Sequence, residues 1–224
     1  MVLSALRQLV NDKRRDVTSN FNTDAQITRY FNEALRRLQG LNDWEWTQTS
    51  TSVAYVSGTT AYAAPTDWKA PISLFYSFTQ PYMFVSPEDW MVLSANPSNT
   101  WTKKGANLLI NSNFGNGTLS CSYYSYYMAQ TSGGSLTAEL ASDTDSPTMP
   151  EYYQDALVHY ALSVIYQKEG LTDDYQIEMN NWERLVQDLK REFPAKRANY
   201  LHRMRHINEF SVGGVYDRKE SPLA

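Results

Sequence analysis

The sequence predicts an α+β fold in which two helical flanks enclose a β module. Apolar residues recur at helical spacing before Trp44 and after Pro150, and between these positions they alternate with polar residues. The charges follow the same division, since only three of the 20 bases and seven of the 24 acids fall between Trp44 and Pro150. We therefore expect an antiparallel-type helical bundle with an inserted antiparallel β module that carries a short helix.

The N-terminal flank predicts two helices. Leucines and valines approach helical spacing over about residues 2–16, and Asn20-Phe21-Asn22 interrupts this pattern. Thr23-Asp24-Ala25-Gln26 then has the pattern of a capping box, in which Gln26 reaches back to the first residue. A second helix follows, and Gly40 is expected to end it.

The middle of the chain changes to a period of two, which indicates strands. We expect a long strand from Trp44 to Tyr55, a turn at Ser57-Gly58-Thr59 and a short return strand at 61–64. Another strand is expected at 72–78.

The second half of the module predicts a short helix and a hairpin. Ser86-Pro87-Glu88-Asp89 has a capping hydroxyl, a proline and first-turn acids, and so indicates a helix start. Residues 101–110 and 119–128 are expected to pair across the glycine-rich stretch at 113–117. Gly133-Gly134 and Ser146-Pro147 indicate a slack loop that leaves the module.

The C-terminal flank predicts two further helices and a basic arm. One helix is expected from Pro150 to Gly170, and the next from a capping Thr172 to Pro194. From Lys196 to Arg205 the chain holds bases and no acid. We expect four segments in all, which are 1–43, 44–148, 149–194 and 195–224.

Composition excludes several classes of protein. The net charge is −4 and the pI about 5.4, whereas a dedicated nucleic-acid-binding protein normally has a clear excess of basic residues. The single cysteine, Cys121, allows no intrachain disulfide. The first residues lack the features of a signal peptide, and no stretch approaches the roughly 20 apolar residues of a membrane helix. We expect a soluble protein made in the cytoplasm.

No pattern indicates catalysis, a cofactor or a metal. His202 and His206 share the i, i+4 spacing of metal ligands, but Arg203 and Arg205 beside them disfavour a cation. His159 is expected to be structural. No phosphate loop, zincin motif or nucleophile elbow occurs, so we expect a protein that is not an enzyme.

Tyr123-Tyr124-Ser125-Tyr126-Tyr127 leaves two alternatives open. Interleaved aromatic residues can stack the bases of single-stranded nucleic acid, but such platforms also need a positive groove. The net negative charge of the module favours a subunit or tail interface, for which Tyr124, Tyr126 and Trp101 are the candidates. The basic stretch after Pro194 is equally open, as either a solvated helix end or an arm that docks on a partner.

Three stretches of the sequence, taken in order, carry a resemblance to a known protein family. They are residues 27–35 followed by Asp43-Trp44-Glu45-Trp46, a strand that ends at 62–68, and a helix at 149–161 that leads through Lys168-Glu169-Gly170 into a charged final helix. Their order resembles the head–tail connector adaptors of tailed bacteriophages, including the collar proteins of short-tailed phages.

The resemblance implies a structural virion protein, made in the cytoplasm of an infected bacterial host. It implies a ring, commonly of twelve copies, that lies beneath the portal, extends the DNA channel without sequence recognition and attaches a tail or nozzle protein. The C-terminal arm would then dock on the portal through the following side chains: Arg197, Tyr200, Arg203, Arg205 and Phe210. The alternatives are a single-stranded nucleic-acid-binding module and an accessory protein that binds a small ligand or glycan.

Overall fold

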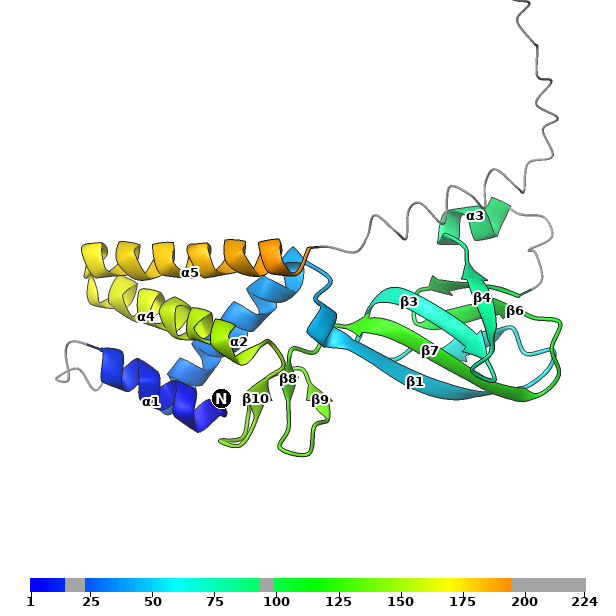
Figure 1. The fold of residues 1–224 in the computed structure, drawn as a ribbon, viewed down its shortest axis with the longest axis horizontal. Coiled ribbons are helices and arrows are strands. Elements are labelled where there is room, and N and C mark those ends of the chain that lie inside the picture. The colour runs from blue at the N-terminus through cyan, green and yellow to red at the C-terminus, as the bar shows by residue number, and fades with distance from the viewer. Residues whose placement is uncertain (15–22, 93–98, 195–224) are drawn as a thin grey trace, which may run out of the picture.

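The computed structural model describes residues 1–14, 23–92 and 99–194. The described chain is a mixed α+β fold, elongated in shape, with four helices gathered at one end and a seven-stranded sheet at the other (Figure 1). The α+β class is therefore confirmed.

Four long helices share one hydrophobic core. They are α1 (Leu3–Lys13), α2 (Asp24–Leu41), α4 (Asp155–Glu169) and α5 (Thr172–Glu192). Helix α4 packs against the other three and is apolar on nearly every side, because it lies in the middle of the group. Short 3₁₀ turns η1 (Glu45–Thr47) and η2 (Glu151–Tyr153) flank this group.

Some of the local signals at the helix ends are confirmed and others are wrong. The Thr23 hydroxyl accepts from the Gln26 N–H at 3.3 Å and the Gln26 side chain accepts from the Thr23 N–H at 2.9 Å, so the capping box is present. Gly170 ends α4 with a left-handed φ of 75°. Gly40, in contrast, lies inside α2, and Thr172 makes no capping bond. The first helix ends at Lys13, earlier than expected.

The seven-stranded sheet has the order β1-β7-β3-β4-β5-β6-β2. Its strands are β1 (Gln48–Tyr55), β2 (Ala61–Ala63), β3 (Trp68–Tyr76), β4 (Gln80–Phe84), β5 (Thr100–Lys104), β6 (Asn107–Asn111) and β7 (Gly117–Ser125). All pairs are antiparallel except β4 with β5, which lie on either side of α3 (Pro87–Val92) in the sequence. The Ser86 hydroxyl accepts from the Asp89 N–H at 3.0 Å, which confirms the predicted helix start.

Several strand predictions are wrong. The tryptophans at 44 and 46 do not belong to the first strand, because the chain forms η1 before β1 begins. The short strand β2 pairs with β6 and not with β1. Residues 101–110 form a hairpin by themselves, whereas β7 pairs with β1 and β3. Strand β4 was not predicted.

The expected slack loop is ordered. It contains a small sheet of β8 (Ala129–Gln130), β9 (Leu136–Thr137) and β10 (Ser146–Pro147) in the order β10-β8-β9. Met128, Leu140 and Met149 belong to the buried core of the helices. A second core lies inside the seven-stranded sheet. The segment from 128 to 149 therefore packs with the helices, although the sequence suggested that it belongs to the β module.

Candidate functional site

The C-terminal end of α5 is fixed beside the start of the seven-stranded sheet. The Phe193 carbonyl accepts from the Asn42 side-chain amide at 2.8 Å, and the Phe193 ring meets Trp46 edge-on at 4.9 Å. Trp46 in turn stacks on the buried Trp44 at 4.8 Å. Since η1 leads directly into β1, residues 195–224 continue from a point where helices and sheet meet (Figure 1).

Two tyrosines of η2 hold the last residue of α5. The hydroxyls of Tyr152 and Tyr153 both donate to the Glu192 carboxylate, the second at 2.7 Å. These bonds, that of Tyr152 first, lower the pKa of Glu192 because they stabilise its charged form. The hydrogen bond between Tyr153 and Glu192 raises the pKa of Tyr153 to about 12. The end of α5 is thus tied to two separate parts of the chain.

A buried lysine joins α2 to the sheet at the same place. The Lys69 ammonium on β3 donates to the carbonyls of Gln39 and Asn42 and lies 3.3 Å from the Asp43 carboxylate. Its side chain is 11% exposed and that of Asp43 only 4%. A cation at the negative end of a helix is stabilising. Lys69 therefore fixes the end of α2 against the sheet.

Exposed apolar side chains flank this junction. Gln39 donates its side-chain amide to the backbone carbonyl of Tyr126, which brings the end of α2 next to the segment that leaves β7. The Tyr126 side chain is 47% exposed and Leu41 is 46% exposed. Large apolar side chains exposed beside a rigid junction are typical of surfaces that contact another protein.

The predicted interface residues are placed differently from one another. Trp101 is 1% exposed and contacts Trp68 and Phe84 inside the sheet, and Tyr124 is 8% exposed. Only Tyr126 has an exposed ring among the three candidates. Tyr123 is also buried, stacked on Trp68 at 4.8 Å, so it offers no free face to a base.

The predicted portal-docking residues lie outside the described residues, as do His202 and His206. These side chains are Arg197, Tyr200, Arg203, Arg205 and Phe210. They follow Pro194 closely, so the structure describes the point from which they continue but not their own arrangement.

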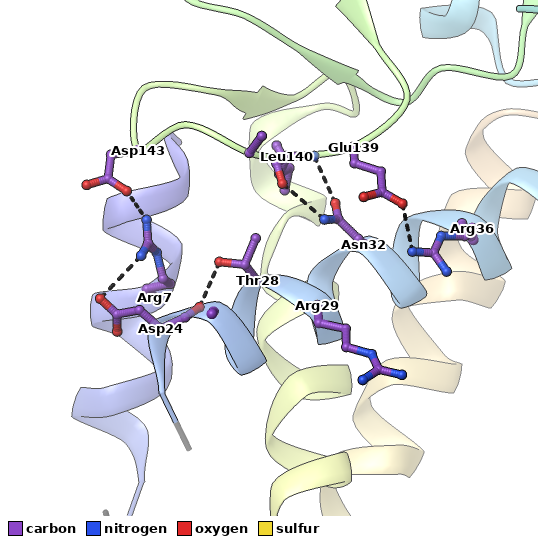
Figure 2. A pocket seen from close by; sticks show the side chains of 11 residues that line it. Arg7, Asp24, Thr28, Arg29, Asn32, Arg36, Glu139, Leu140 and Asp143 are labelled. Atoms are coloured by element: carbon purple, nitrogen blue, oxygen red, sulfur yellow. Dashed lines mark hydrogen bonds and ion pairs between the residues drawn. The ribbon is translucent and has the colours of Figure 1, made fainter. Parts of the chain in front are cut away.

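A separate cleft of about 560 Å³ opens between α1, α2 and the loop at 139–145 (Figure 2). Arg7 reaches Asp24 at 3.2 Å and also pairs with Asp143, while Arg36 pairs with Glu139 at 2.9 Å. Each of these arginines thus has a carboxylate partner.

The buried side chain of Asn32 is central to this cleft. It donates to the Leu140 carbonyl at 3.0 Å and accepts from the Leu140 N–H at 2.8 Å, as Figure 2 shows. Asp145 accepts from the backbone N–H groups of Ala141 and Ser142, and its own carbonyl accepts from Leu3. These bonds fasten the loop to α1 and α2. With three arginines and three acids in its lining, the cleft has no surplus charge to attract an anion.

Sequence reasoning missed Lys69 and Asn32. Lys69 is the only base between Trp44 and Lys103, and a single base in a stretch with few charges was a usable signal. Asn32 lies on the apolar face of α2, where a polar residue indicates a buried hydrogen-bond partner. Neither pattern, however, identifies the partner in the sequence.

The described residues hold no group of three or more metal-ligating side chains that could bind an ion. Within the same ranges, no helix is long and apolar enough to span a bilayer. His159 contacts the Glu178 carboxylate between α4 and α5, which is consistent with a structural role. Burial raises the pKa of the Cys121 thiol to about 12, so this cysteine is unsuited to act as a nucleophile.

The chain matches the model of a known protein family. The model of the SU10 adaptor protein family covers residues 2–206. No curated protein matches the chain. Because the match extends over nearly the whole sequence, the chain belongs to the SU10 adaptor protein family, a family of phage head–tail adaptors.

Proposed function

We propose that this SU10 adaptor is a structural virion subunit that forms a ring between the portal and the tail. The ring, of about twelve copies as in related connectors, extends the DNA channel and presents the surface to which a tail or nozzle protein attaches. The helical bundle forms the ring body, and the chain performs no catalysis. The subunit is made in the host cytoplasm and is then built into the head–tail interface.

The observation that carries this proposal is the fixed end of α5. Asn42, Trp46 and the two tyrosines of η2 hold Glu192 and Phe193, so the residues that follow leave from one defined position. An arm that starts from a rigid point loses less conformational entropy on docking than one that starts from a loose end. This favours residues 195–224 as the portal-docking arm, with Arg197, Tyr200, Arg203, Arg205 and Phe210 as its contacts.

Charge supports the passage of DNA without recognition. A net charge of −4 gives little general attraction for phosphates. The buried rings of Tyr123 and Tyr124 offer little to a single-stranded nucleic acid, so the tyrosine strands favour a structural role.

The proposal is tested by mass determination with light scattering, with and without the portal ring of the same virion. The full chain should add to the portal in a fixed number of copies. The double variant Arg203→Glu and Arg205→Glu should bind at least tenfold more weakly, because both charges are reversed in the docking arm.

The control is Lys103→Glu with Lys104→Glu, which makes the same change in charge on β5. This variant should bind the portal as the unchanged protein does. Equal binding by the arm variant would refute the docking assignment. Tight single-strand binding without any portal addition would instead favour the nucleic-acid-binding alternative.

A further inference from the structure

Three loops meet at the end of the seven-stranded sheet that lies away from the helices. They are residues 56–60, 77–79 and 112–116, which we call the tip. Strand β1 starts beside the helices and ends at Tyr55, which pairs with Gly117, while Tyr76 at the end of β3 pairs with Leu119 (Figure 1). The turns that follow these strands therefore lie together.

Hydrogen bonds and stacked aromatic rings hold the loops of the tip in place. The Tyr76 hydroxyl donates to the carbonyl of Asn116 at 3.0 Å, and its ring stacks on Phe114 at 4.6 Å. Gly117 leaves room for this contact, because a Cβ atom there would approach the Tyr76 ring to 2.5 Å and the ring would have to move. The Ser57 N–H donates to the Asn116 side chain at 2.8 Å and so ties a second loop to the first. A surface that is already rigid loses little entropy on binding.

Phe78 stands on the tip in an unfavourable backbone conformation. Ser77 and Phe78 have φ values of 49° and 61°, and the Tyr76 carbonyl accepts from the Thr79 N–H at 3.1 Å, as in a type I′ turn. Such turns favour asparagine and glycine, and a positive φ is rare for a bulky residue. The Phe78 side chain is nevertheless 69% exposed, the highest value among the exposed large apolar residues of the described chain. Neither local folding nor core packing accounts for a phenylalanine here.

The absence of charged residues on the tip restricts what the Phe78 side chain could contact. Residues 46–66, 70–87 and 105–138 contain no acidic, basic or histidine side chain. A surface without cations lacks the electrostatic attraction that draws phosphates, whether they belong to DNA or to anionic lipids. Apart from Val56, the loops consist of serine, threonine, asparagine, glycine and phenylalanine, and this composition suits protein contacts.

We infer that the tip is a docking surface for another protein, in which the Phe78 ring enters an uncharged apolar pocket. Val56, which is 52% exposed, lies on the neighbouring loop and adds to the apolar contact. The tip lies at the opposite end of the molecule from the helices, and away from the junction at which the portal-docking arm begins (Figure 1). The occupant is therefore the tail-side protein, an assignment that rests on the proposed function.

The test uses the full chain, the purified tail or nozzle protein of the same virion, and the variant Phe78→Gly. Glycine adopts a positive φ without strain, so the variant should keep its fold and gain up to about 2–4 °C in Tm. Its affinity for the tail protein should fall at least tenfold, since an aromatic anchor is lost. The control is Ile177→Ala on α5, which removes a side chain that is 54% exposed and should leave the affinity unchanged.

Portal addition by light scattering is measured in parallel, because it tests the proposed function and does not involve the tip. Unchanged affinity of Phe78→Gly for the tail protein would overturn the inference, and so would a lack of tail-protein binding by a chain that adds to the portal. Phe78-dependent binding to vesicles of phosphatidylcholine or phosphatidylglycerol, or self-association lost in Phe78→Gly, would overturn the assignment of the occupant. If the chain bound the tail protein through Phe78 but did not add to the portal, the tip would remain the docking surface for the tail protein. The assignment of residues 195–224 as the portal-docking arm would then be refuted.

Discussion

Around the helices charged side chains join distant segments, whereas in the seven-stranded sheet aromatic rings do so. Arg7, Arg14 and Arg36 pair with acids more than 100 positions away in the sequence. In the sheet, Trp68 contacts both Trp101 and Tyr123 through their rings. Both regions have a buried apolar core. They differ in their other long-range contacts, which are ion pairs at the surface around the helices and ring contacts in the interior of the sheet. This difference leaves the far end of the sheet uncharged and suited to apolar contact.

The largest effect is expected from Trp101→Ala, which removes the centre of the sheet core. Trp101 is 1% exposed and meets Phe84 at 4.9 Å, so truncation should lower the free energy of unfolding by about 3–5 kcal/mol. Urea unfolding monitored by near-UV circular dichroism measures it. Tyr126→Ala serves as the control, because its ring is 47% exposed and its loss should change stability by only about 0.5 kcal/mol. Similar values for both variants would contradict the description of the sheet core.

Lys69 is one of the residues that link the two regions. In Lys69→Met the carboxylate of Asp43 loses a cation at 3.3 Å while it stays buried, so the free energy of unfolding should fall by about 3 kcal/mol. Adding Asp43→Leu should recover part of this loss, since the buried carboxylate is then gone. Small-angle scattering should show a wider distribution of shapes for the single variant. A single variant as stable as the unchanged protein would show that Lys69 does not join the regions.

A smaller effect is expected at the cleft of the helical region. Asn32→Ala leaves both backbone groups of Leu140 without their partner, at a loss of about 1–3 kcal/mol. Amide exchange at residues 139–141 should accelerate, while exchange in β7 should not. Thr28→Ala is the matched control, because its hydroxyl bonds only within α2, to the Asp24 carbonyl. Unchanged exchange at 139–141 would mean that Asn32 does not fasten the loop.

Lowering the pH should reduce the stability of the helical region through protonation of Glu33. The Tyr160 hydroxyl donates to this carboxylate at 2.5 Å and is the main cause that lowers its pKa below 4.5. A lowered pKa contributes stability above pH 4.5 that is lost as the pH falls through the folded value. Solvent screens this partly exposed group, so the contribution is under about 1 kcal/mol. Between pH 7 and 3, Tyr160→Phe should lose less stability than the unchanged protein, and an equal loss would exclude this pair as a cause.

The last experiment changes no residue and uses labelling of the Cys121 thiol to report when the sheet opens. The thiol is buried and its pKa is raised to about 12, so a thiol reagent at pH 8 should label the folded chain very slowly. In rising urea, labelling should follow the opening of the sheet, and far-UV circular dichroism the loss of the helices. Coincident transitions would show that the two regions unfold as one unit. Rapid labelling without urea would contradict the burial of β7.

Helices were predictable where their signals are local. Thr23 and Gln26 are three residues apart, and Gly170 ends α4 by its own backbone conformation. Gly40 was misleading because α2 continues to Leu41, and the distant Lys69 donates to the carbonyls of Gln39 and Asn42 at this end of the helix. Strand pairing was not predictable, since β1 finds its partner β7 more than 60 residues later in the chain. Of the three candidate interface residues, only Tyr126 was placed where a partner could reach it, because alternation alone does not tell which face of a sheet is covered. The candidates in the docking arm lie outside the described residues.

The sequence by itself determined the α+β class, the ends of several helices, the confinement of most charges to the flanks and the family of the chain. These properties depend on composition, on short-range spacing or on the order of motifs. Only the tertiary structure decided that the segment from 128 to 149 packs with the helices, that Lys69 closes the junction, and that Phe78 stands exposed on a braced tip. Each of these depends on contacts between residues far apart in the chain, and no local pattern specifies which distant group will fill a given space.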